Sequence, residues 1–135
     1  EKPSDAKLLW SDEKNLRGLM SQALCRKGVC YLLDRSHGLT AFDIKTGKIF
    51  WRDNHQITSQ DRNPHASLVW SQSDGDAFAL NADGELVYLY LGKEGFKEYW
   101  REQITAKTWA HPAFVQDRLY ARDDQSVVCF QLPIN

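Results

Sequence analysis

The chain of 135 residues is long enough for one compact domain with a buried core, and too short for two ordinary domains. Its 17 Lys and Arg residues against 18 Asp and Glu residues give a formal net charge of -1. Without a cationic excess, we expect no nucleic-acid partner. The longest strongly apolar run, residues 86–91, is far shorter than the roughly 18 residues that cross a bilayer, so we expect no membrane insertion. The first residues show no signal-peptide pattern, and we expect any export signal to lie outside this sequence.

Three tryptophans mark an internal repeat. Trp10, Trp51 and Trp100 each close a short segment of strand-like sequence, at intervals of 41 and 49 residues. One four-stranded blade of a β-propeller occupies about 40 to 50 residues. The spacing therefore predicts propeller blades in tandem.

Short strands separated by turns rich in Gly, Asp, Asn and Ser fill the space between the tryptophans. We predict an outer strand of a preceding or closing blade at 7–10, a blade at 21–52, a second blade at 65–101 and an incomplete blade at 111–132. The predicted strands of the three units are Ala23–Arg26, Val29–Leu33, Gly38–Asp43, Lys48–Arg52, Ser67–Ser71, Asp76–Leu80, Glu85–Leu91, Phe96–Arg101, Pro112–Val115, Arg118–Ala121 and Val127–Phe130.

Several of these segments are apolar on both faces, as expected for a sheet packed between two neighbouring sheets. A β-sandwich is the main alternative, but it gives no reason for a tryptophan at blade-length intervals. The predicted fold class is all-β, with four-stranded antiparallel meanders that form part of a larger propeller. Helix is expected at most as a short turn within 15–21 or 101–107.

Residues 41–51 read A-x-D-x-x-T-G-K-x-x-W and resemble the tryptophan-docking repeat of the quinoprotein (PQQ-like) β-propellers. Gly47 permits a tight turn, Asp43 and Thr46 can hydrogen-bond the turn backbone, and Trp51 can pack between blades. The second unit keeps only part of this pattern, and the third stops before it. The expected structural motif comprises Ala41, Asp43, Thr46, Gly47, Trp51 and Trp100.

The resemblance implies two functional classes. Scaffold propellers of the bacterial envelope bind proteins and carry no quinone, whereas quinoprotein dehydrogenases hold pyrroloquinoline quinone (PQQ) and calcium. The sequence lacks the adjacent Cys-Cys pair that some of those enzymes place over the cofactor. We therefore expect a non-catalytic binding or scaffold domain of the periplasm or cell envelope, with a protein partner and no cofactor. A fragment of a PQQ-dependent dehydrogenase is the alternative.

A binding site is expected on one face of the propeller, where the long loops 53–65 and 102–111 meet the turns between second and third strands. His65 and His111 take the same position in consecutive repeats when aligned by sequence. They either hold a ligand or cap backbone carbonyls; two histidines alone make an incomplete metal site, so none is assigned. The candidate ligand or partner face comprises His65, His111, Trp109, Arg62, His37 and Arg122.

Cys25 and Cys30 face each other if residues 27–28 form a two-residue hairpin turn. Their Cβ atoms would then lie about 4.5 to 5.5 Å apart, close to disulfide range. Because Cys is often simply a small apolar filler, we expect buried free thiols at these positions and at Cys129. A disulfide between Cys25 and Cys30 is the alternative.

The third unit lacks a fourth strand, and the segment 7–10 resembles a fourth strand without its first three. The outer faces of the first and third units are expected to be open and apolar, and such patches are rarely left in water. We therefore expect a homo-oligomer, most simply a two-fold dimer in which segment 7–10 of each copy completes the last blade of the other.

Overall fold

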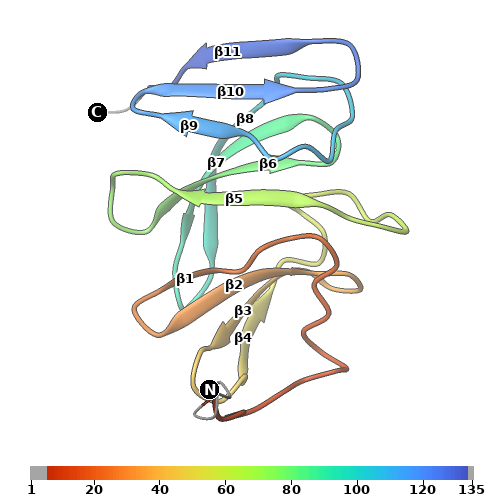
Figure 1. Ribbon diagram of the computed structural model, residues 1–135. Coiled ribbons are helices and arrows are strands. Elements are labelled where there is room, and N and C mark those ends of the chain that lie inside the picture. Colours follow the sequence, from red (N-terminus) through yellow and green to blue (C-terminus); the bar gives the residue numbers. More distant parts are fainter. Residues whose placement is uncertain (1–5, 134–135) are drawn as a thin grey trace, which may run out of the picture.

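The computed structural model describes residues 6–133, and the only regular elements in this range are β-strands (Figure 1). They form three antiparallel sheets, two of four strands and one of three. None of the described residues belongs to a helix that could span a membrane. The strands are β1 Leu24–Arg26, β2 Val29–Asp34, β3 Gly38–Asp43, β4 Ile49–Arg52, β5 Ala66–Trp70, β6 Asp76–Asn81, β7 Glu85–Leu91, β8 Phe96–Gln103, β9 Ala113–Val115, β10 Arg118–Arg122 and β11 Val127–Gln131.

Each sheet is a meander of consecutive strands, which confirms the predicted all-β fold. We call the sheets blade 1 (β1–β4), blade 2 (β5–β8) and blade 3 (β9–β11). They follow one another from the N-terminal to the C-terminal end of the molecule, with blade 2 in the middle (Figure 1). This arrangement is that of a partial β-propeller.

Apolar side chains fill both spaces between blades. The cluster between blades 1 and 2 includes Tyr31 and Ala41 on one side and Ala79 and Leu89 on the other. A second cluster joins Phe78 and Leu86 of blade 2 to Leu119 of blade 3. Burying apolar area in this way is the main stabilising contribution available to stacked sheets. Blade 2 is therefore apolar on both faces, as its sequence predicts.

The docking tryptophans occupy the same place in blades 1 and 2. Trp51 lies opposite Ala41, and Trp100 lies opposite Tyr88. In both blades a β-bulge follows this pair, so the residue before the tryptophan has no partner on the third strand. A bulge increases the local strand twist. The shared bulge shows that the two fourth strands have the same register.

Each docking tryptophan belongs to one unit and binds the next. The indole Nε1 of Trp51 donates a hydrogen bond to the Gly92 carbonyl at 2.9 Å, and its ring packs against Phe96 of blade 2 at a centroid distance of 5.5 Å. Trp10 binds blade 1 in the same manner, because its Nε1 donates to the Ile44 carbonyl at 3.0 Å. Trp51 and Trp100 are both partly buried between blades.

The turn between β3 and β4 has the hydrogen bonds that the motif predicts. Asp43 Oδ1 accepts the backbone N–H groups of Lys45 and Thr46, each at 2.9 Å, and the Thr46 hydroxyl at 3.0 Å. The hydroxyl bond from Thr46 is the main cause that lowers the pKa of Asp43. Gly47 adopts φ 73°, and a Cβ there would lie 3.0 Å from the Trp10 ring. Glycine therefore allows both the positive φ of the turn and the close approach of the Trp10 ring.

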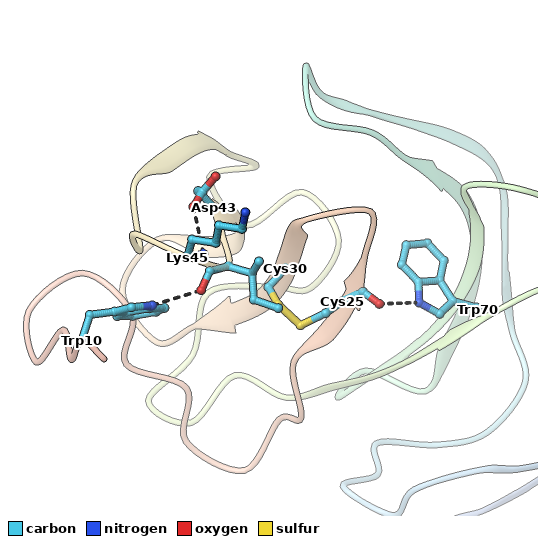
Figure 2. Close-up of a disulfide and its surroundings, with 7 residues drawn as sticks. Trp10, Cys25, Cys30, Asp43, Lys45 and Trp70 are labelled. Atoms are coloured by element: carbon cyan, nitrogen blue, oxygen red, sulfur yellow. Dashed lines mark hydrogen bonds between the residues drawn. A yellow bond between two sulfur atoms is a disulfide. The ribbon is translucent and has the colours of Figure 1, made fainter. Parts of the chain in front are cut away.

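The predicted free thiols at Cys25 and Cys30 are wrong, because these residues form a disulfide between β1 and β2 (Figure 2). The two-residue turn at Lys27 and Gly28, both with positive φ, places the cysteines opposite each other at a Cα–Cα distance of 4.1 Å. Cys129 is free but exposed, not buried as predicted. It lies on the face of β11 that points away from blade 2, where no described residue covers it.

Residues 7–10 form no strand, which corrects the prediction of an outer strand there. A strand needs a neighbour for its backbone hydrogen bonds, and no strand in residues 6–133 lies beside this segment. The short helical turns considered within 15–21 and 101–107 are also absent, and β8 extends through Gln103.

The outer face of blade 1 is covered, contrary to the expectation that it is open. The Trp10 ring packs edge-on against Phe42, at a centroid distance of 6.0 Å. The backbone at Gly18 passes so close to Leu32 that a Cβ there would lie 2.8 Å from a leucine methyl carbon. Phe42 and Thr40 are buried as a result. Among the described residues, the blade face that stays open is that of blade 3, with Val127 74% and Val115 55% exposed.

Candidate functional site

A cavity of about 440 Å³ lies between blades 2 and 3, beside the β6–β7 and β10–β11 turns. Its wall includes Trp109, whose side chain is 54% exposed, and Arg122 at the end of β10. Both were predicted to belong to the ligand or partner face. The lining residues are Asp61, Ala82, Asp83, Lys107, Thr108, Trp109, Ala110, Arg122, Asp123 and Asp124.

One polar side chain at the end of each second strand shapes this face of the molecule. Asp34, Asn81 and Asp123 hold equivalent positions in blades 1, 2 and 3. In each case the side-chain oxygen Oδ1 accepts a backbone N–H two residues further on, which fixes the following turn. The pairs are Asp34 with Ser36 at 2.9 Å, Asn81 with Asp83 at 3.1 Å and Asp123 with Gln125 at 2.8 Å.

The same three side chains also bind the loop that enters their blade. Asp34 Oδ2 accepts the N–H of Arg17 at 2.8 Å, and Asp123 Oδ2 accepts the N–H of Ala106 at 3.0 Å. The Asn81 amide donates to the Ile57 carbonyl at 3.0 Å. In each blade, one polar side chain therefore joins this turn to the preceding loop, and Asp123 does so at the cavity wall. Asp123 is not among the residues predicted for this face, although it joins the β10–β11 turn to the loop before blade 3.

The carboxylate of Asp123 is ionised at neutral pH. Backbone hydrogen bonds from Gln125, Ala106 and Ser126 lower its pKa to about 2. Asp83 lies 3.8 Å from the Lys107 ammonium group and accepts the Ser59 hydroxyl. Four aspartates against two cationic side chains give the lining an excess of negative charge.

His65 and His111 contact each other but are not among the residues that line this cavity. Their rings pack edge to face at a centroid distance of 5.3 Å, and the Ser67 hydroxyl lies 2.8 Å from His111 Nδ1 and 3.4 Å from His65 Nε2. His65 is buried, and its Nδ1 has no hydrogen-bond partner within residues 6–133. Burial, together with nearby His111, lowers the pKa of His65, which favours the neutral ring.

The predicted positional equivalence of the two histidines is wrong. Val69 pairs with Phe78 and Ala113 pairs with Tyr120, so strand pairing makes Ser67 the counterpart of His111. The longer turn between β5 and β6 shifts the sequence alignment by two residues. The structure nevertheless brings the rings together, because the innermost strands of neighbouring blades lie side by side.

The remaining predicted residues lie outside the cavity wall. His37 belongs to the β2–β3 turn of blade 1, where its Nδ1 lies 2.6 Å from Asp34 Oδ1. Arg62 follows the lining residue Asp61 and is exposed. Within the described part of the chain, no three His, Cys, Asp or Glu side chains gather closely enough to hold a metal ion.

The buried carboxylate of Asp53 is a further residue that the sequence analysis did not single out. It accepts the backbone N–H groups of Leu39 at 2.7 Å, Ile57 at 2.8 Å and His55 at 3.0 Å. Burial raises the pKa of this group, although the three hydrogen bonds oppose that effect. Its partners are all backbone groups, so it fixes the start of the loop between blades 1 and 2.

The fold and this loop face define a three-bladed part of a β-propeller with a cavity on its loop face. No protein-family model matches the chain, and no curated protein matches its sequence.

Solved structures share the fold. BamB from Moraxella catarrhalis is 17% identical, with a TM-score of 0.67 over 92% of this chain and 36% of that chain. The computationally designed Ika4 protein is 14% identical, with a TM-score of 0.57 over 94% of this chain and 74% of that chain. The chain thus spans about a third of the length of BamB.

Proposed function

We propose that this chain is a non-catalytic binding segment of a PQQ-like propeller in the cell envelope, and that it binds a protein through the cavity between blades 2 and 3. The observation that carries the proposal is the half-exposed Trp109 at a cavity with excess carboxylates. Similarity in fold to BamB supports a propeller of this kind. We also propose that no quinone is bound.

The cavity favours a basic side chain of the partner. A cation over an indole face is attracted by the ring quadrupole, and Trp presents the best face for this contact. Asp124 lines the same cavity as Trp109 and adds an attractive charge. Cavities between rigid sheets, closed by loops, are frequent binding sites in proteins. We therefore assign the partner an exposed Arg or Lys that enters beside Trp109.

The test is an NMR titration of the chain with a short amidated peptide that carries one arginine, observed at the indole N–H signals. We expect the Trp109 signal to shift, and the shift to be lost in an Asp124→Asn variant. The control peptide has alanine in place of arginine, and the control variant is Asp117→Asn, away from the cavity. Equal shifts with both peptides, or none, would show that this cavity does not select a basic side chain.

The absence of quinone is tested separately by adding PQQ and calcium to the purified chain. We expect no quinone absorbance to be retained after desalting and no dye reduction. Retention of a stoichiometric red-shifted chromophore would replace the scaffold proposal with the dehydrogenase alternative.

A further inference from the structure

Another cavity, of about 200 Å³, lies between blades 1 and 2, which are both complete four-stranded sheets. We call it the Trp70 cavity, after the tryptophan at the end of β5 that lines it. Because the strands of a meander are antiparallel, consecutive turns alternate between the two edges of the sheet. The Trp109 cavity adjoins the β6–β7 turn, whereas the Trp70 cavity adjoins the β5–β6 and β7–β8 turns of the same blade. The two cavities therefore lie at opposite edges of blade 2.

The lining of the Trp70 cavity carries an excess of positive charge. Arg26, Lys27 and Lys93 contribute three cations, and Asp74 is the one carboxylate in the lining. Asp74 forms ion pairs with Arg26, at 3.4 Å, and with Lys27. Among the ion pairs of residues 6–133, none involves Lys93. The cavity therefore attracts anions, and the Lys93 ammonium group can donate hydrogen bonds to one.

Tyr31 supplies a second donor to this cavity. The residue is only 3% exposed, and its ring packs against Trp51 and Trp70 at centroid distances of 6.0 and 5.8 Å. Within residues 6–133 its hydroxyl has no hydrogen-bond partner, although Tyr31 lines the cavity. Burial, together with nearby Tyr90, raises the pKa of Tyr31 to about 12, so the hydroxyl is neutral and can donate. Since hydroxyl groups in the interior are usually paired, its partner must come from whatever fills the cavity.

The cationic side of the cavity is held in place by several contacts. The Arg26 guanidinium lies 5.2 Å from the centroid of the Trp70 ring, and its Nη1 donates to the Ser73 carbonyl at 3.4 Å. Trp70 Nε1 in turn donates to the Cys25 carbonyl at 3.4 Å (Figure 2). The disulfide from Cys25 to Cys30 fixes the hairpin that carries Arg26. A site on such rigid elements loses little conformational entropy when it binds a ligand.

The volume and walls of the cavity favour one acidic side chain. Small-molecule sites usually have roughly 300–1,000 Å³, more than is available here. Val29 and Leu91 in the wall can contact the methylene groups of a glutamate. Lys93 and the Tyr31 hydroxyl can donate to its carboxylate oxygens, and hydrogen bonds to a charged group are the stronger ones. A phosphate group has no apolar part and would leave the walls without a contact.

We propose that the Trp70 cavity is a second binding site, which takes a glutamate side chain from an acidic segment of a protein partner. This inference does not depend on the Trp109 site, where a basic side chain is expected. Two sites of opposite charge at opposite edges of blade 2 allow two segments of partner protein to bind at the same time.

The test is an NMR titration of the chain with a short peptide, blocked at both ends, that carries one glutamate. We expect the indole N–H signal of Trp70 to shift and that of Trp109 to stay unchanged. The control peptide has glutamine in place of glutamate. Equal Trp70 shifts with both peptides, or none with either, would overturn the proposal. The arginine peptide that tests the Trp109 site should leave the Trp70 signal unchanged, so the two proposals can fail independently.

Lys93→Gln should weaken binding of the glutamate peptide about tenfold, as expected for the loss of one hydrogen bond between charged groups. Lys93 is exposed, so the fold should be retained. Lys97→Gln is the matched control, because both ammonium groups lie over aromatic rings, Lys93 over Phe50 at 4.9 Å and Lys97 over Tyr99 at 5.5 Å. Equal weakening by the two substitutions would mean general attraction of charge, and would overturn the assignment of the site.

Two further measurements define the chemistry of the ligand. Tyr31→Phe removes only the hydroxyl, and it should weaken binding of the glutamate peptide about fivefold. An unchanged affinity would overturn the role assigned to this hydroxyl. Inorganic phosphate should cause no Trp70 shift at the concentration that saturates the glutamate peptide. Tighter binding of phosphate than of the peptide would make the cavity a phosphate site and overturn the proposal.

Discussion

The Trp51 indole and the Gly92 carbonyl are joined by a 2.9 Å hydrogen bond that crosses from blade 1 to blade 2. The same ring packs against Phe96 and Tyr31, one from each of the two blades. One side chain thus provides both a polar and an apolar link between sheets that are not hydrogen-bonded to each other along their strands. Its two contributions can be separated by substitution.

Trp51→Phe keeps an aromatic ring and removes the N–H donor. We expect a loss of about 1 kcal/mol in the free energy of unfolding, the usual value of one hydrogen bond. Trp51→Ala also leaves a cavity and should cost about 3–5 kcal/mol. Urea unfolding measures both, with Trp109→Phe as an exposed control that should change stability by less than about 0.5 kcal/mol. A larger effect at Trp109 than at Trp51 would contradict the docking role.

Gly47→Ala should weaken the docking of Trp10. Its φ of 73° is unfavourable for alanine, and the new methyl group would press on the Trp10 ring. We expect a loss of about 1–3 kcal/mol, as for other residues held in strained backbone regions. Gly95→Ala is the matched control in the corresponding turn of blade 2, because a Cβ there meets no atom within 4 Å. Equal stability of the two variants would argue against contact between residue 47 and Trp10.

Acidification should destabilise the protein through His65. The unfolded chain binds a proton at this histidine near its ordinary pKa of 6.5, whereas burial and His111 lower the pKa in the folded state. The unfolded state therefore binds more protons as the pH falls below that value, and the free energy of unfolding decreases. Unfolding measured at pH 7.5 and pH 5.5 should show a smaller difference in His65→Gln. Identical differences in the two proteins would mean that His65 does not contribute.

The disulfide is expected to survive purification without reductant. Intact mass should then be lower than the fully reduced mass by two hydrogen atoms. Alkylation should modify only Cys129 before reduction and all three cysteines after it. For so short a loop, loss of the disulfide should cost about 2 kcal/mol in the chain-entropy model. Modification of three thiols before reduction would restore the free-thiol interpretation.

Much of the fold could be predicted because the same pattern of strands and turns recurs along the sequence. Turn residues at similar spacing place every predicted strand after residue 20 within two residues of its observed ends. The prediction of a strand at 7–10 fails for a physical reason. Its pattern encodes a strand, but a strand depends on a partner that the local sequence does not contain. Tertiary context likewise decides the outer face of blade 1, which the loop before β1 covers.

The candidate site could be predicted only in part. Loop length indicated Trp109, and the position of the turn between second and third strands indicated Arg122; both line the cavity. The roles of Asp34, Asn81 and Asp123 in binding the preceding loop are long-range, and a polar residue at a turn does not reveal them. A comparison of the residue that ends the second strand in each repeat would have been the useful signal.

Trp10 and Trp51 each bind the blade that follows them in the sequence, and this affects how the protein unfolds. Stability in such an array is a sum of the intrinsic stability of each unit and the coupling between neighbours. Here the side chain that provides much of the coupling is encoded about ten residues or more before the unit it stabilises. In Trp51→Ala, amide hydrogen exchange should therefore accelerate in β7 and β8 as much as in β4. In blade 3 it should accelerate only as far as blade 2 is destabilised. The cooperative segments of the molecule are offset from the segments that the sequence repeats.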